Sequence, residues 1–141
     1  MMGSAVSLVK VQRQSEDMKD AVSRALGLVG FKPSGSVKSV VIKPNLCYYW
    51  GASTGYTTDT RLVAGIIDYV RETCGDVEIK VAEADATAMR TKLAFRVLGY
   101  EKLAEEKNKE LFNLSTDEIS QEKVEVEGRE IDFQIPQSLL K

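Results

Sequence analysis

The sequence predicts an α/β fold, a three-layer sandwich with a mostly parallel sheet and a C-terminal β-hairpin. Short apolar runs alternate with longer segments of helical periodicity through residues 5–114. This order of strand, helix and strand is typical of parallel sheets with right-handed crossovers and with helices on their faces. Two alternating segments then flank Gly128-Arg129, which predicts a hairpin that extends one edge of the sheet.

The N-terminal part of the chain predicts a strand followed by a helix. Residues 5–12 are rich in Val and Leu and alternate weakly between apolar and polar side chains. Ser15 can cap a helix whose apolar residues recur at helical spacing over 18–29. Gly30 then ends this helix.

The central part predicts a buried strand, a long loop and a second helix. Residues 40–42 are β-branched and apolar, and Pro44 stops further pairing because it lacks an N–H group. The loop over 44–57 is long for so small a domain, which is typical of functional or mobile loops. Thr58 or Asp59 can cap the helix that follows.

Further elements follow in the same order. Alternation over 77–81 predicts a strand, and the polar segment 83–87 leads from it into a helix. Gly99-Tyr100 breaks this helix, and residues 101–110 resume it as a charged, solvated helix. Residues 111–114 are apolar enough for one more strand.

Length and composition limit the class of protein. The chain has 141 residues, 28% of them charged, with a net charge of −2. We therefore expect a single α/β domain over 1–141 and no nucleic-acid partner, because nucleic-acid binding needs a basic face. No apolar run approaches the roughly 20 residues that span a bilayer. We expect no membrane association and a cytoplasmic location.

The chain has no histidine and only two cysteines, Cys47 and Cys74. The absence of histidine excludes Ser–His–Asp and Cys–His catalysis within this chain. The cysteines are too far apart to match a zinc or iron–sulfur motif, so we expect no metal site and no cofactor in this chain. No catalytic residues can be assigned.

Polar residues gather where the predicted strands end. In open α/β sheets, ligands bind outside the carboxyl ends of the strands, so we expect these side chains to converge at one edge. Lys43 and the N–H groups that start the second helix could together bind a small anion. The candidate ligand-binding residues are Lys43, Asn45, Thr57, Thr58, Glu83 and Asp85.

Each candidate also has a structural explanation. Lys43 can form an ion pair with Glu83 or Asp85 instead of binding a ligand. The amide of Asn45 can fix the turn after Pro44, and Thr58 can cap a helix. Glu83 and Asp85 could alternatively share a divalent cation or act as acid and base.

Three segments of the chain carry distinctive motifs, namely Val-Ile-Lys-Pro-Asn-Leu at 41–46, Gly-Tyr-Thr-Thr-Asp at 55–59, and 95–100 with its Leu-Gly-Tyr ending. Together they resemble the domain of unknown function 362 family of bacteria and archaea. The resemblance implies that a second half normally follows, so the chain would be the N-terminal part of a longer protein. Some members add a ferredoxin-like domain, so an iron–sulfur cluster is expected only in a missing C-terminal region.

Two functions remain open. The first is the binding of a small anionic ligand at the strand ends, as part of an enzyme or a redox-associated protein. The second is a structural or interaction module that docks through the Tyr48–Trp50 loop and the sheet edge. If a second half is missing, apolar surface around Phe133, Ile135, Leu139 and Leu140 would be exposed. Contact with that half or formation of a homo-oligomer would cover it.

Overall fold

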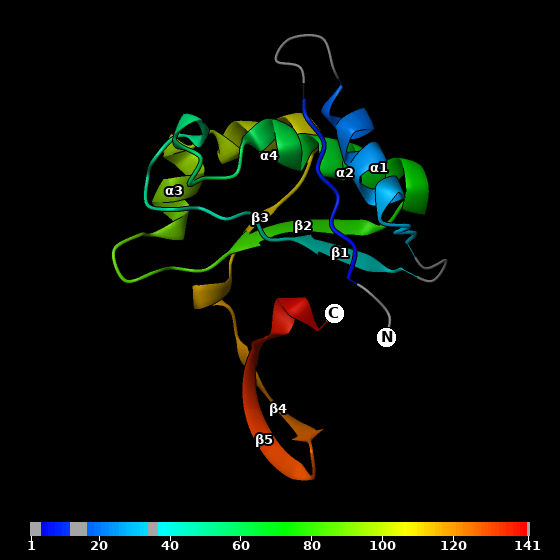
Figure 1. The fold of residues 1–141 in the computed structure, drawn as a ribbon. Helices are drawn as coiled ribbons and strands as arrows, with labels where there is room; N and C mark the ends of the chain where they lie inside the picture. The colour runs from blue at the N-terminus through cyan, green and yellow to red at the C-terminus, as the bar shows by residue number, and fades with distance from the viewer. Residues whose placement is uncertain (1–3, 12–16, 34–36, 141) are drawn as a thin grey trace.

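A computed structural model of the chain describes residues 4–11, 17–33 and 37–140. It confirms an α/β fold with a parallel sheet and a C-terminal β-hairpin (Figure 1). The elements are α1 (Met18–Leu28), β1 (Ser39–Ile42), η1 (Ala52–Thr54), α2 (Thr60–Cys74), β2 (Glu78–Glu83), α3 (Thr91–Val97), α4 (Tyr100–Lys107), β3 (Leu111–Asn113), η2 (Leu114–Thr116), β4 (Ile119–Val126), β5 (Arg129–Pro136) and η3 (Gln137–Leu139), where η marks a short 3-10 turn. None of the described helices is long and apolar enough to cross a membrane.

The parallel sheet has the strand order β1-β2-β3, so the chain always steps in the same direction. Right-handed crossovers that step one way leave every connecting helix on the same face of a sheet. Figure 1 shows this arrangement, with all four described helices on one side of the sheet. The other side of the sheet carries none of the described α-helices, and η3 of the C-terminal segment lies there (Figure 1).

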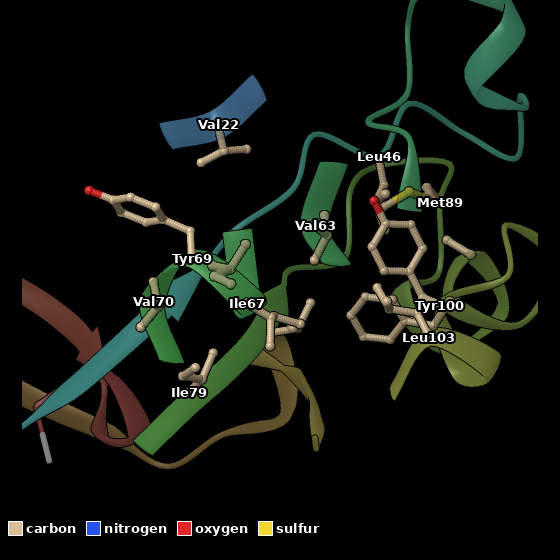
Figure 2. Packing of buried hydrophobic residues seen from close by; sticks show 14 residues of the cluster. Val22, Leu46, Val63, Ile67, Tyr69, Val70, Ile79, Met89, Tyr100 and Leu103 are labelled. Carbon is tan, nitrogen blue, oxygen red and sulfur yellow. The ribbon is translucent and has the colours of Figure 1, made fainter. Parts of the chain in front are cut away.

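The hydrophobic core lies between the sheet and α2. Val63 and Ile67 of α2 pack over Ile79 and Val81 of β2, and Tyr100 at the start of α4 closes one end (Figure 2). These side chains are inward-facing because the strand alternates and the helix repeats at three and four residues. The core thus fixes the positions of the strand ends.

Gly65 sets the close approach of α1 to α2. A Cβ atom at this position would lie 2.8 Å from the backbone carbonyl carbon of Met18. Since the obstructing atom belongs to the backbone, α1 could not yield without moving as a whole. The α1 helix therefore packs against α2 at a distance that only glycine at position 65 allows.

Carboxylate side chains cap the N-termini of α1 and α2, and a glycine separates α3 from α4. Asp17 caps α1 by accepting from the Lys19 N–H group at 2.9 Å, whereas the predicted cap Ser15 lies outside the described residues. Asp59 caps α2, as one of the two predicted alternatives. Gly99 has a φ of 82° and separates α3 from α4, which confirms the predicted break.

Two sequence predictions about strands are wrong. Residues 5–11 form no strand, because no described segment pairs with them; Gln12 lies outside the described residues. The hairpin also does not extend the parallel sheet but forms a sheet of its own. The physical reason is that β3 is short and leads directly into η2, which turns the chain away from the sheet before β4 begins.

The far face of the parallel sheet carries a buried cation. Lys80 alternates with the core residues of β2, so its side chain lies on the face away from the helices. Its ammonium donates to the carbonyl oxygen of Ser138 at 3.3 Å and lies 5.7 Å from the ring centre of Phe112. An ion pair of 3.2 Å with Glu78 completes its surroundings. Lys80 therefore attaches η3 to the sheet.

Candidate functional site

An ion pair joins the ends of β1 and β2. Lys43 directly follows β1 and Glu83 ends β2, and the two strands are parallel neighbours. The Lys43 Nζ and Glu83 Oε1 atoms are 2.5 Å apart. The side chain of Glu83 is 7% exposed, whereas that of Lys43 is 56% exposed. The pair predicted as one structural alternative thus forms, with its carboxylate buried and its ammonium facing outward.

Asn45 and Thr58 close the long loop between β1 and α2. The Asn45 N–H group donates to Thr58 Oγ1 at 2.9 Å, and the Thr58 N–H group donates to the Asn45 carbonyl at 2.8 Å. The side-chain amide of Asn45 donates to the carbonyl of Tyr56 at 2.7 Å. These contacts use both residues to hold the loop, which is the structural alternative for Asn45.

Two buried residues, Thr57 and Tyr100, hold the same loop from its buried side. Thr57 is buried, and its hydroxyl accepts from the Cys47 N–H group at 3.4 Å. The Tyr100 hydroxyl, which is fully buried, donates to the carbonyl of Thr58 at 2.9 Å. Burial raises the pKa of Tyr100, and the nearby Asp59 and Glu83 carboxylates raise it further.

Sequence reasoning did not identify Tyr100 as part of this site. An aromatic residue that starts a helix after glycine normally indicates packing, and its ring does pack in the core. Its hydroxyl nevertheless donates a hydrogen bond to Thr58, at the end of the loop that follows Lys43. The Leu-Gly-Tyr segment quoted for the family resemblance is the signal that could have drawn attention to it.

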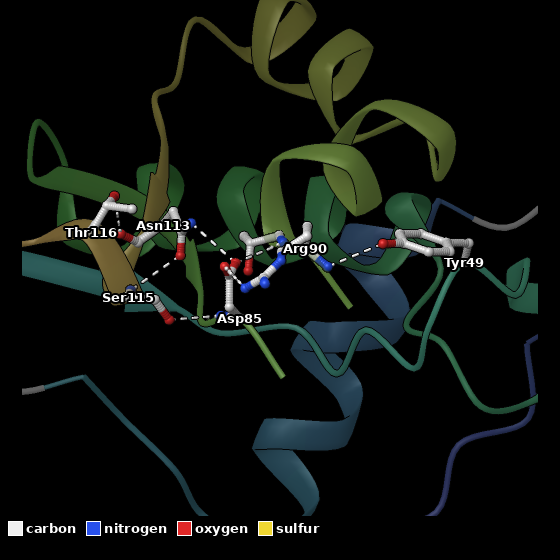
Figure 3. Close-up of polar contacts among 7 residues, drawn as sticks. Tyr49, Asp85, Arg90, Asn113, Ser115 and Thr116 are labelled. Carbon is white, nitrogen blue, oxygen red and sulfur yellow. Dashed lines mark hydrogen bonds and ion pairs between the residues drawn. The ribbon is translucent and has the colours of Figure 1, made fainter. Parts of the chain in front are cut away.

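Asp85 is the centre of a hydrogen-bonded network at the ends of β2 and β3 (Figure 3). Its carboxylate accepts from the Thr91 N–H group at 2.9 Å, the Asn113 amide at 3.1 Å and the Arg90 guanidinium at 3.1 Å. The Asp85 N–H group donates to Ser115 Oγ at 2.8 Å. The Thr91 N–H group, with smaller effects of Arg90 and Asn113, lowers the pKa of Asp85. Asp85 therefore joins the segments after two strands.

The N-terminus of α2 is already occupied by a carboxylate. Asp59 Oδ1 accepts from the Arg61 N–H group at 2.8 Å, and its Oδ2 lies 2.7 Å from Arg61 Nη2. The Arg61 side chain lowers the pKa of Asp59, so the cap stays charged. The Arg61 N–H group, one of the donors expected for an anion, thus already donates to Asp59.

Three aromatic rings cluster on the loop beside this edge. The ring centres of Tyr48 and Trp50 are 5.4 Å apart, as are those of Trp50 and Tyr56. All three rings are about half exposed. The Tyr49 hydroxyl accepts from the Arg90 N–H group at 3.1 Å, which ties the loop to the exit of β2 (Figure 3).

The candidates therefore divide into two sets. In the first set, polar groups form hydrogen bonds within the fold; its members are Asn45, Thr57, Thr58 and Asp85. Lys43 and Glu83 form one pair whose cationic end faces solvent. Within the described ranges, no three His, Cys, Asp or Glu side chains are grouped to hold a metal ion. Lys43 is consequently the candidate best placed to meet a ligand.

The comparisons with known proteins agree with the three resembling segments. The family model described as domain of unknown function (DUF362) matches residues 40–141, from β1 to the C-terminal end, and spans all six candidate residues. The α1 helix precedes the matched region. Neither the search of curated proteins nor the search of solved structures found a match. The chain belongs to the DUF362 family.

Proposed function

We propose that the carboxyl edge of β1 and β2 binds a small anionic ligand, and that Lys43 is its cationic contact. The observation that supports this proposal is the asymmetry of the ion pair, in which the buried Glu83 holds an exposed ammonium. An ammonium group has three N–H donors, and Glu83 takes one of them. The other two can donate to a carboxylate or phosphate oxygen.

At this end of the sheet, the positively charged side chains lie closer to solvent than the carboxylates that they pair with. In each of three ion pairs, the cationic side chain is more exposed than its carboxylate partner. The pairs are Lys43 with Glu83, Arg61 with Asp59 and Arg90 with Asp85. A ligand that approaches from solvent therefore meets the cations first, which favours an anion even though the charges sum to zero.

Glu83 acts in this proposal as a positioning residue. Its carboxylate fixes the ammonium of a side chain that would otherwise lose much rotamer entropy when a ligand binds. A fixed donor recognises a small, compact anion better than a flexible one does. The ligand class is thus a phosphate or a small carboxylate, bound within an enzyme or a redox-associated protein.

Titration of the labelled protein with inorganic phosphate and with acetate, followed by two-dimensional NMR, tests the proposal. We expect amide shifts confined to residues 43–60 and 83–85, with weak binding that salt reduces further. Lys43→Met should weaken phosphate binding about tenfold or more, which corresponds to about 1.4 kcal/mol.

Two further variants control this titration. The pair Lys43→Met with Glu83→Gln removes both charges together, so that no buried carboxylate is left without a countercharge. Lys102→Met removes an exposed lysine of α4 and should leave binding unchanged. If residues 43–60 do not shift, or if Lys102→Met weakens binding as much as Lys43→Met, the anion site is wrong.

The aromatic cluster favours a second candidate function, an interaction module. Tyr48, Trp50 and Tyr56 expose their rings next to one another, and Tyr and Trp are enriched where proteins bind partners. A partner at this loop would quench or shift the fluorescence of Trp50, the single tryptophan. Phosphate binding at Lys43 without a response of Trp50 would favour the ligand site over this module.

A further inference from the structure

The β4–β5 hairpin has two chemically different faces. Strand pairing places Val124 opposite Ile131 and Glu122 opposite Phe133, and alternation puts these four side chains on one face. The other face is polar, with Lys123 bound to Glu130 and close to Asp132 (2.5 and 3.9 Å). The hairpin is thus amphipathic from the Gln121–Gln134 pair to its turn.

The apolar face has no cover in the described part of the chain. Val124, Val126, Ile131 and Phe133 are each more than 40% exposed. Figure 1 shows the hairpin projecting away from the body of the domain. A two-stranded hairpin is at best marginally stable in water without a layer against its apolar face. This face is therefore suited to packing against another surface.

The charges on this face select the partner. Glu122 lies on the face toward the base of the hairpin, where Ser120 Oγ donates to its carboxylate at 3.1 Å. Arg129 lies on the same face next to the turn, opposite Val126. No carboxylate among the described residues pairs with Arg129. The face thus carries a negative charge at the middle of the hairpin, opposite Phe133, and a positive charge at its tip, opposite Val126, with Val124 and Ile131 between them.

We propose that this face binds the same face of a second copy of the chain, with the two hairpins antiparallel about a two-fold axis near Val124 and Ile131. In this arrangement the Glu122–Phe133 pair of one hairpin lies over the Val126–Arg129 pair of the other. Glu122 of each copy then approaches Arg129 of the other, and the contact is made twice by symmetry. A parallel arrangement would bring like charges together instead, and it would place both domain bodies at the same end.

The dimer is expected to be weak. The face offers only a few half-exposed apolar side chains, so it buries far less than the roughly 1,600 Å² of a standard interface. The protein should therefore exchange between monomer and dimer as its concentration changes. This weak association still provides a sharp test, because charge substitutions can shift it in both directions.

Sedimentation velocity of the whole chain at several concentrations measures the dimer directly. Glu122→Arg alone and Arg129→Glu alone each create two like-charge contacts, and each should raise the dissociation constant about tenfold. The combined variant Glu122→Arg with Arg129→Glu restores opposite charges across the two-fold axis. Its dissociation constant should return to within about threefold of the original value.

A matched control carries the same new charges on the polar face. Gln121 and Gln134 are paired opposite each other there, so Gln121→Arg with Gln134→Glu should leave the dimer unchanged. A monomer at every concentration would overturn the proposal. A dimer that ignores the single charge changes, or that the combined variant does not restore, would also overturn it, since a different surface would then mediate association.

Discussion

The carboxyl edge of the sheet and the C-terminal hairpin differ in what the fold leaves unsatisfied. At the sheet edge, polar side chains such as Asn45 and Asp85 have found partners within the chain, and one ammonium faces solvent. On the hairpin, apolar side chains such as Ile131 remain uncovered. Charge is therefore the property left for recognition at the edge, and hydrophobic surface is the property left on the hairpin.

The largest expected effect comes from testing the same substitution in the core that positions the sheet edge and on the hairpin. Ile67→Ala removes a side chain that is 0% exposed in the core and should destabilise the protein by about 2–5 kcal/mol. Ile131→Ala removes one that is 41% exposed on the hairpin and should cost less than about 1 kcal/mol in the monomer. Urea unfolding at low protein concentration measures both values. Equal losses would mean that the hairpin face is covered in solution.

Sequence patterns predicted the central elements because burial dictates their composition. The β-branched run 40–42 became β1, and the alternation over 77–81 became β2. Since parallel neighbours end at the same edge, the prediction that Lys43 and Glu83 meet also follows from sequence order, and their ion pair confirms it. Ligand binding by these residues stays a prediction.

Pairing and hydrogen-bond partners could not be read from the sequence. Residues 5–11 have strand-like composition, but composition does not supply the neighbouring strand that pairing requires. The same holds for the hairpin, whose alternation predicts the turn but not its separation from the main sheet. The network of Asp85 depends on Asn113 and Ser115, which the fold brings in from a distant segment. The spacing of residues within one segment does not predict contacts between segments that are far apart in the sequence.

A smaller effect should distinguish the two members of the Lys43–Glu83 pair. Lys43→Met leaves the buried carboxylate without its cationic partner and, among the described residues, with only the Ala84 N–H group as a donor (2.8 Å), which should cost about 1–3 kcal/mol. Glu83→Gln leaves an exposed ammonium that water can solvate, so it should cost at most about 1 kcal/mol. Urea unfolding near neutral pH compares the two, and combining them should recover part of the loss from Lys43→Met. A larger loss from Glu83→Gln would contradict the assigned burial.

The smallest expected effect concerns the acid sensitivity of the polar network. The Thr91 N–H group and the neighbouring donors lower the pKa of Asp85 in the folded protein below the usual value near 3.8. The carboxylate therefore stabilises the fold above about pH 4, and this contribution is lost as the pH falls through its lowered pKa. Asp85→Asn removes the charge. It also places an amide NH₂ group where a carboxylate oxygen accepted hydrogen bonds from neighbouring donors. Its stability should depend less steeply on pH between about 5 and 2 than that of the unchanged protein.

Thermal unfolding across this pH range measures both slopes. Glu105→Gln makes the same change of charge on the exposed surface of α4 and sets the baseline. If Asp85→Asn lost stability in acid as steeply as the unchanged protein, other carboxylates would account for the acid response. Asp59 would then be the next to test, because Arg61 lowers its pKa at the cap of α2. A flatter slope for Asp85→Asn alone would show that protonation of Asp85, and not of the Asp59 cap, accounts for the loss of stability in acid.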